Sequence, residues 1–228
     1  MNLKKIIVAL DNNDLKKTIK IVKELKEHTF AFKIGYEFFY NFGLDGYKLI
    51  KNENVKIFLD LKLHDIPNTV KKGIIAISKL EPYFVTIHIS GGDDMLKAAN
   101  LAKNNIKILG VSILTSLNSK LTEKYYYNKN IDNIVSNYTQ YALENNLDGI
   151  VCSPREISKI KNKAQKKLLI ITPGIRPANY DISNDDQSRT MTPKEAIEAG
   201  ADYLVIGRPI TQSKDPLKTL KSINDSLE

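Results

Sequence analysis

Short apolar runs recur along the whole chain, with helix-like segments between them. The eight runs cover residues 5–10, 30–34, 55–61, 84–89, 106–113, 149–152, 168–172 and 203–206. Most are rich in Ile, Val and Phe with little strict alternation, which is typical of parallel strands buried on both faces. Such strands, alternating with helices over 228 residues, predict an α/β fold, a (β/α)8 TIM barrel. An open doubly wound sheet is the alternative.

The segments between the runs carry the periodicity of amphipathic helices. Apolar residues at helical spacing form two sets, Leu15, Ile19, Val22 and Leu25, and Val70, Ile74, Ile77 and Leu80. The segment 131–147 shows a similar pattern. Residues 192–195 have the sequence of a capping box with proline at the first helical position, which predicts the start of a further helix.

Length and composition favour one globular domain. The chain has 228 residues, 42% of them hydrophobic and 26% charged, and we expect a single domain over residues 1–228. No apolar stretch has the length of a membrane span, and the N-terminal segment resembles a signal peptide only in its basic start. The single cysteine, Cys152, excludes an intramolecular disulfide and favours a cytoplasmic protein.

The net charge of +8 raises the question of nucleic-acid binding. However, the lysines are scattered along predicted helical faces, and no arginine-rich block collects them. We interpret them as a solvated surface whose positive field helps to attract an anionic substrate. Neither a nucleic-acid partner nor a membrane partner is expected.

The third apolar run ends in a group of charged residues. Residues 55–59 precede Asp60, Lys62 and Asp65, which brings three charges toward one point. Because side chains two apart on a strand share a face, Asp60 and Lys62 should point to one side and Leu59, Leu61 and Leu63 to the other. Buried charges require partners. The group is therefore either a structural ion pair or a site that uses a lysine proton beside a fixed negative charge.

Polar and charged residues also stand at the ends of the other predicted strands. They are Asp11, Lys33, His88, Thr115, Ser116, Arg176 and Arg208, and Gly207 directly precedes the last of them. In a (β/α)8 barrel these ends build the active site, and phosphate often binds after the seventh and eighth strands. Gly207 would allow close approach of a phosphate, and Arg208 would offer it a bidentate fork. The alternatives are a surface ion pair for Arg208 and a snorkelling side chain for Lys33.

A metal site is not expected at these strand ends. Asp60, Asp65 and His88 could coordinate a divalent cation, but Lys62 and Lys33 would place positive charge at the same point. We interpret the histidines of this region as packed, hydrogen-bonded side chains.

The sequence resembles the orotidine 5'-monophosphate decarboxylase family in its compact bacterial form. The shared segments are VALD (8–11), FKIGYEFF (32–39), FLDLKLHDIPNTV (58–70), SGG (90–92), LTS (114–116), DGIVCSPRE (148–156), TPGIRP (172–177), DQSRTMTP (186–193) and VIGRPIT (205–211). They occur in the family's order over nearly the whole chain, and the third and the last three are very specific together.

The resemblance implies a barrel that works as a homodimer with shared active sites. It implies conversion of orotidine 5'-monophosphate to uridine 5'-monophosphate and carbon dioxide, the last step of de novo pyrimidine nucleotide synthesis. It also implies that neither a metal nor an organic cofactor takes part.

Carried over position by position, the resemblance assigns catalytic roles. Lys62 would protonate the ring carbon C6 after the carboxylate leaves, and Asp60 would lie beside that carboxylate. Lys33 and Asp65 would complete a network of alternating charges.

The resemblance also assigns substrate-binding roles. Asp11 and Lys33 would hold the ribose hydroxyls, while Thr69 and Asp65 would reach across the dimer into the partner's site. The remaining expected binding residues are Ile66, Thr115 near the pyrimidine, and Arg176, Gln187, Gly207 and Arg208 at the phosphate end. The segment 179–186 lacks the glycine common in related sequences, and we expect it to be a mobile loop.

Two other functions compete with this one. A related Mg²⁺-dependent barrel acting on sugar phosphates, a decarboxylase or an aldolase, would share the Asp-x-Lys-x-x-Asp pattern at residues 60–65. It would not be expected to share residues 64–69, 172–177 and 186–189 as well. A non-catalytic basic barrel that binds phosphate or RNA is the other alternative, and the absence of basic patches interleaved with aromatic residues argues against it.

Overall fold

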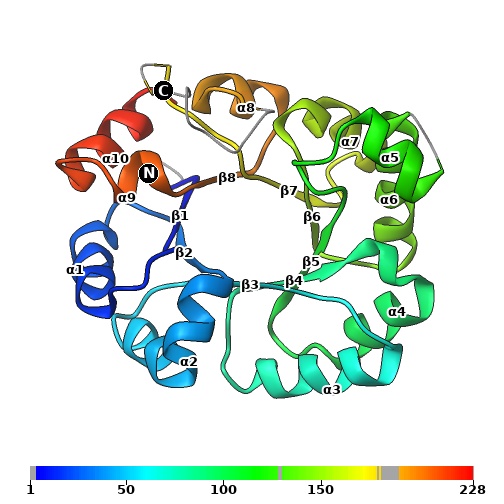
Figure 1. The fold of residues 1–228 in the computed structure, drawn as a ribbon, viewed down its shortest axis with the longest axis horizontal. Coiled ribbons are helices and arrows are strands. Elements are labelled where there is room, and N and C mark those ends of the chain that lie inside the picture. The colour runs from blue at the N-terminus through cyan, green and yellow to red at the C-terminus, as the bar shows by residue number, and fades with distance from the viewer. Residues whose placement is uncertain (1–3, 128–129, 179, 181–189, 228) are drawn as a thin grey trace.

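The computed structural model describes residues 4–127, 130–178, 180 and 190–227. Eight parallel strands of this part of the chain close into a barrel (Figure 1). They are β1 (Ile6–Ala9), β2 (Ala31–Ile34), β3 (Ile57–Leu63), β4 (Phe84–His88), β5 (Lys107–Val111), β6 (Gly149–Val151), β7 (Leu169–Thr172) and β8 (Tyr203–Ile206). Each strand pairs with the next, and β8 pairs with β1. The closed ring confirms the predicted barrel over the open sheet.

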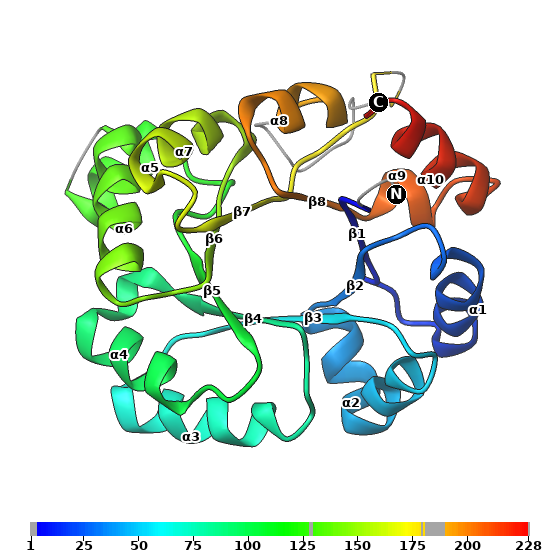
Figure 2. The same cartoon turned by 180° about the vertical axis from the view of Figure 1, so that it is seen from behind.

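Helices form an outer ring around the strands, as both faces of the molecule show (Figure 1 and Figure 2). The α-helices of the described residues are α1 (Leu15–Leu25), α2 (Tyr36–Lys51), α3 (Pro67–Ser78), α4 (Asp93–Ala102), α5 (Ser119–Tyr126), α6 (Ile131–Glu144), α7 (Ile157–Ala164), α8 (Pro193–Ala199), α9 (Arg208–Thr211) and α10 (Pro216–Asp225). Short 3₁₀ turns, η1 (Ile89–Gly91) and η2 (Pro154–Glu156), follow β4 and precede α7. None of the helices described is long and apolar enough to cross a membrane.

A local sequence signal places the start of α8, whereas two other predicted helices end earlier than expected. The capping box is confirmed, since the Thr192 N–H donates to Glu195 Oε2 at 3.0 Å and the Glu195 N–H donates to Thr192 Oγ1 at 3.4 Å. The segment predicted as 131–147 ends earlier, at Glu144, because Asn146 adopts a left-handed φ of 52° that no helix continues. Leu80 likewise lies beyond the end of α3.

The third strand differs in extent from its prediction. The apolar run suggested residues 55–61, whereas β3 spans Ile57–Leu63. The strand therefore begins later and continues through the charged residues Asp60 and Lys62. Its pairing with β4 shifts register between Leu59 and Leu63. This irregularity lies where the candidate site begins.

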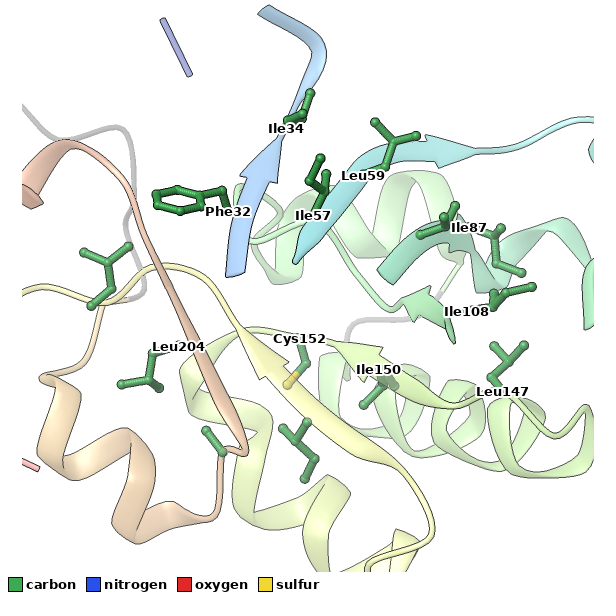
Figure 3. Packing of buried hydrophobic residues seen from close by; sticks show 14 of the residues in the cluster. Phe32, Ile34, Ile57, Leu59, Ile87, Ile108, Leu147, Ile150, Cys152 and Leu204 are labelled. Atoms are coloured by element: carbon green, nitrogen blue, oxygen red, sulfur yellow. The ribbon is translucent and has the colours of Figure 1, made fainter. Parts of the chain in front are cut away.

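A large apolar cluster fills the space between the strands and the helices. Figure 3 shows side chains of this cluster from consecutive strands, among them Ile34 of β2, Leu59 of β3 and Ile87 of β4. These positions are fully buried, as the lack of alternation in the apolar runs predicted.

A smaller apolar cluster fills the interior of the barrel. Its members are Ile7, Ala9, Ala31, Phe58, Phe84, Leu109, Ile171 and Val205. Because side chains two apart on a strand point the same way, Lys33 follows Ala31, Asp60 follows Phe58 and Thr86 follows Phe84 on the inner side. The inner cluster thus carries a layer of polar side chains on one side.

Candidate active site

A cavity of about 310 Å³ opens inside the barrel above the inner apolar cluster. Ala9, Phe58 and Val205 belong to both the cluster and the cavity lining. The predicted site residues that line it are Asp11, Lys33, Asp60, Lys62, Thr115, Arg176, Gly207 and Arg208. The strand ends of the barrel therefore bring together residues spread over most of the chain, as their positions predicted.

One wall of the cavity is apolar and was not foreseen from the sequence. It includes Val111 at the end of β5, Ile113 shortly after it, Val151 at the end of β6 and Cys152 directly after it. Burial raises the pKa of the Cys152 thiol well above its ordinary value, so this side chain is a neutral, apolar part of the wall. These residues carry no sequence signal that separates them from other buried strand residues. A flat, partly apolar ring fits against such a wall.

Asp11, Lys33, Asp60 and Lys62 form a row of alternating charges, which we call the ion cluster. Lys33 Nζ lies 3.1 Å from Asp11 Oδ1 and 3.7 Å from Asp60 Oδ2. Lys62 Nζ lies 2.9 Å from the same Asp60 Oδ2. Lys33 and Asp60 are only 8% and 9% exposed. Lys33 is therefore a buried, doubly paired cation and not a snorkelling side chain.

Electrostatics keep the buried charges of the ion cluster ionised. Burial alone would lower the pKa of Lys33, but the charges of Asp60 and Asp11 and their hydrogen bonds raise it overall. Burial alone would raise the pKa of Asp60, but Lys33, Lys62 and hydrogen bonds from Lys62 and Thr86 lower it. The Asp60 contribution to stability is thus present above its unfolded pKa and lost as pH falls through its folded pKa. The Lys33 contribution is lost as pH rises through its raised pKa.

The backbone of Lys62 has an unusual conformation. Its φ of 43° lies in the left-handed region that a lysine rarely adopts. The Lys62 N–H donates to Thr86 Oγ1 at 2.9 Å, and Thr86 Oγ1 donates to Asp60 Oδ1 at 2.9 Å. Sequence reasoning missed Thr86, although a threonine within the apolar strand Phe84–His88 is a visible polar signal.

Gly35 and Tyr36 support the ion cluster from the end of β2. A Cβ on Gly35 would lie 2.7 Å from Asp11 Oδ1 and 2.9 Å from Lys33 Nζ, so only glycine leaves room for this ion pair. The Tyr36 hydroxyl donates to the Leu61 carbonyl at 3.1 Å, and Lys62 Nζ lies 5.6 Å from the centroid of the Tyr36 ring. Besides Lys33, the segment FKIGYEFF (32–39) therefore contributes Gly35 and Tyr36 to the surroundings of the ion cluster.

Arg176 and Arg208 border the cavity after β7 and β8. Arg176 is 7% exposed, and its Nη1 donates to the Ile175 carbonyl at 2.9 Å. Arg208 is the first residue of α9, directly after Gly207. A Cβ on Gly207 would lie 3.3 Å from the Cβ of Ala9, so glycine allows the chain to approach β1 closely here. Two guanidinium groups at one end of the cavity can bind a dianion such as a phosphate monoester.

Asp65, Ile66 and Thr69 do not line the cavity of their own chain. After β3 ends at Leu63 the chain turns into α3, and all three residues are exposed, Ile66 at 67%. Asp65 Oδ1 accepts a hydrogen bond from the Ile66 N–H at 2.7 Å. The prediction that three charges meet at one point within one chain is therefore wrong for Asp65. Gln187 and, apart from Tyr180, the segment 179–186 lie outside the described residues.

His64 and His88 lie beside each other near the Lys62 side of the site, with ring centroids 5.2 Å apart. Burial lowers the pKa of His88, His64 and Lys62 lower it further, and Asp60 opposes them. The half-buried position of His88 agrees with the interpretation of a packed histidine, whereas His64 is exposed and contradicts it. Within the described residues, His, Cys, Asp and Glu side chains form no group of three or more that could hold a metal ion.

Comparison with known proteins identifies the family. The model of the orotidine 5'-phosphate decarboxylase / HUMPS family matches residues 4–223. Orotidine 5'-phosphate decarboxylase of Dictyoglomus turgidum is 40% identical over 233 residues, which cover 98% of this chain and 95% of that protein. The chain belongs to the orotidine 5'-phosphate decarboxylase / HUMPS family. The resemblance seen in the sequence motifs is thereby confirmed.

Solved structures of the family share the barrel. The crystal structure of orotidine 5'-phosphate decarboxylase from Lactobacillus acidophilus has a TM-score of 0.84 and 35% identity, covering 99% of this chain and 100% of that one. A Methanocaldococcus jannaschii decarboxylase complexed with the inhibitor BMP has a TM-score of 0.80 and 26% identity, covering 99% of each chain. Because these relatives carry the decarboxylase name, they favour that branch of the family over the sugar-phosphate enzymes considered above.

Proposed function

We propose that the protein converts orotidine 5'-monophosphate to uridine 5'-monophosphate and carbon dioxide. The observation that carries this proposal is the ion cluster, with the Lys62 ammonium 2.9 Å from a buried carboxylate inside the cavity. Two arginines border the cavity at the ends of β7 and β8, as a nucleotide with one phosphate requires. The name of the Dictyoglomus turgidum relative supports the same reaction.

Lys62 is the proposed proton donor. When carbon dioxide leaves the pyrimidine, the electron pair of the broken C–C bond remains on C6 with little resonance relief. A fixed ammonium group stabilises this developing charge without reorganisation, which is often the largest catalytic effect in enzymes. The ammonium then donates its proton to C6, and the electron pair forms the new C–H bond. Asp60 holds the Lys62 ammonium in place, and the buried Lys33 in turn holds the Asp60 carboxylate.

Asp60 is proposed to act on the substrate carboxylate as well. A carboxylate bound beside the ionised Asp60 would be repelled, and this repulsion disappears as the charge moves to C6 and the carbon dioxide leaves. The same carboxylate of Asp60 attracts the Lys62 ammonium in the ground state and the transition state. Asp60 therefore disfavours the bound substrate more than the transition state.

The remaining cavity residues are proposed to bind the nucleotide. Asp11 and Lys33 would hold the ribose, and Thr115 would lie near the pyrimidine. Arg176, Gln187, Gly207 and Arg208 would bind the phosphate. Since the phosphate is remote from the bond that breaks, its binding energy can serve to order the site and exclude water.

We also infer that two copies of the chain form a dimer with shared active sites. Asp65, Ile66 and Thr69 are exposed beyond the end of β3, where they could enter the site of a second copy. Tyr36 and Tyr40 on α2 are 45% and 77% exposed, and adjacent exposed apolar side chains support a protein contact. The protein is inferred to work in the cytoplasm, which suits its single reduced Cys152.

The test of the proposed function is the ultraviolet absorbance change when orotidine 5'-monophosphate is added to the purified protein, with and without EDTA. Rapid conversion that EDTA leaves unchanged is expected. The variant Lys62→Ala serves as the negative control for contaminating decarboxylase. No conversion by the folded protein would contradict the proposal, and turnover of a keto-sugar phosphate only with Mg²⁺ would establish the alternative.

A further inference from the structure

The hydroxyl of Thr86 forms hydrogen bonds with both Lys62 and Asp60 of the ion cluster. The residue is completely buried in β4. Its Oγ1 accepts the N–H of Lys62 at 2.9 Å and donates to Asp60 Oδ1 at 2.9 Å. Both partners belong to β3, 24 and 26 residues away in the sequence.

The direction of these hydrogen bonds is fixed by their chemistry. A backbone N–H can only donate, so Thr86 Oγ1 is the acceptor for Lys62. The single hydroxyl hydrogen of Thr86 then goes to Asp60 Oδ1. The other carboxylate oxygen, Oδ2, is left to face Lys62 Nζ at 2.9 Å and Lys33 Nζ at 3.7 Å. Thr86 thus sets the rotation of the Asp60 carboxylate.

The same hydroxyl supports the unusual backbone of Lys62. The left-handed φ of 43° lies in the stretch where the pairing of β3 with β4 shifts register. A bulge of this kind leaves a backbone group without its usual ladder partner, and Thr86 Oγ1 accepts the Lys62 N–H from the neighbouring strand. The left-handed backbone conformation of Lys62 determines the direction in which its side chain projects.

Other buried threonines of the described chain do not share this arrangement. Thr18 Oγ1 donates to the Asp14 carbonyl, Thr139 Oγ1 to the Val135 carbonyl and Thr172 Oγ1 to the Cys152 carbonyl. In each of these bonds the threonine hydroxyl donates to a backbone carbonyl, which is the usual partner of a buried threonine. Thr86 instead donates to an ionised side chain of the cavity.

We propose that Thr86 is a positioning residue that orients the Asp60 carboxylate and the Lys62 backbone together, so that the Lys62 ammonium is aimed at the reacting carbon. This inference rests on the proposed function, because it assigns Thr86 a part in that reaction. Thr86 does not itself touch the substrate, and its effect passes through Asp60 and Lys62.

The test compares Thr86→Val with Thr86→Ser. Thr86→Val keeps the branched shape and removes the hydroxyl, and we expect kcat to fall about 10- to 100-fold, as for loss of a hydrogen bond to a charged group. KM should stay within about threefold, since the phosphate end is untouched. Thr86→Ser restores the hydroxyl and should recover most of kcat. Thr139→Val, which also removes a buried hydroxyl, is the matched control for lost stability and should keep wild-type kcat.

A second measurement separates positioning from simple packing. Without the Thr86 donor, the carboxylate form of Asp60 is less favoured, so the acid limb of the kcat/KM profile should move to higher pH in Thr86→Val and return in Thr86→Ser. If Thr86→Val does not fold, Thr86→Ala takes its place with the same expectations.

The outcomes distinguish this inference from the proposed function. A wild-type protein that converts no orotidine 5'-monophosphate overturns both. An active wild type with a fully active Thr86→Val, or with an unmoved acid limb in that variant, overturns the role of Thr86 alone. Failure of Thr86→Ser to recover kcat also overturns it.

Discussion

At the scale of single residues, Lys62 carries the sharpest prediction. Lys62→Ala removes both the cation that faces the developing charge and the proton that ends the reaction. We expect kcat to fall by about 10⁴-fold or more. Binding of uridine 5'-monophosphate, measured by calorimetry, should change much less, because Arg176 and Arg208 lie at the other strand ends of the cavity.

The matched control for this variant is Lys56→Ala. Lys56 precedes β3, and its Nζ lies 4.3 Å from the centroid of the Phe30 ring, outside the lining of the cavity. This control should keep near wild-type kcat. Near wild-type turnover of Lys62→Ala would contradict the role of Lys62 as proton donor.

Gly35 gives a prediction that the sequence alone does not suggest. In Gly35→Ala the new methyl group would lie within 3 Å of Asp11 Oδ1 and Lys33 Nζ, so these flexible side-chain ends must move apart. We expect kcat/KM to fall about 10- to 100-fold while the free energy of unfolding changes by about 1 kcal/mol or less. Steady-state kinetics and urea unfolding check both parts.

Gly73→Ala in α3 is the corresponding glycine control. Its new methyl group would lie 3.7 Å from Leu63 Cδ1, an ordinary contact, and alanine favours a helix over glycine by about 1 kcal/mol. Equal losses of activity in the two variants would show that Gly35 has no special relation to the ion cluster.

Among the secondary-structure elements, β4 ends in His88, whose titration should make the stability of the fold depend on pH. The folded-state pKa of His88 lies below its ordinary value of 6.5 because burial, His64 and Lys62 disfavour the imidazolium, with Asp60 opposing them. Below pH 6.5 the unfolded chain therefore binds a proton that the folded chain does not. Stability should fall as pH falls from 6.5 and level off below the folded-state pKa.

The measurement is the free energy of unfolding in urea, followed from neutral pH into this acidic range. His88→Gln should remove part of the slope, and the difference between the two proteins isolates His88 from other titrating groups. Parallel curves for wild type and His88→Gln would contradict the prediction.

At the scale of the whole molecule, the proposed dimer predicts complementation between two inactive variants. If Lys62 of one copy and Asp65 of the other serve the same site, a dimer of Lys62→Ala and Asp65→Ala chains holds one intact site. Random mixing by co-refolding should then recover about a quarter of wild-type activity. Sedimentation of each variant alone verifies that both still form dimers.

An activity of the mixture equal to the mean of the two variants would mean that each chain builds its own site. The exposed position of Asp65 on the chain's own surface would then need another explanation.

The pattern of strands and helices and the charged character of the site follow from the amino-acid sequence. Runs of Ile, Val and Phe without alternation predicted buried parallel strands, because strands covered on both faces tolerate no polar side. Lys33, Asp60 and Lys62 were predictable as site residues because charges at the ends of such strands need partners. The motifs then identified the family.

The contacts between these residues become visible in the folded barrel alone. Closing the barrel places Thr86 of β4 against Asp60 and Lys62 of β3, and no local signal encodes a hydrogen bond between strands. The left-handed conformation of Lys62 likewise lies in the stretch where the pairing of β3 with β4 shifts register, and neither feature is visible in the sequence. Residue type and spacing follow from the chain, whereas register and side-chain direction follow from packing between strands distant in sequence.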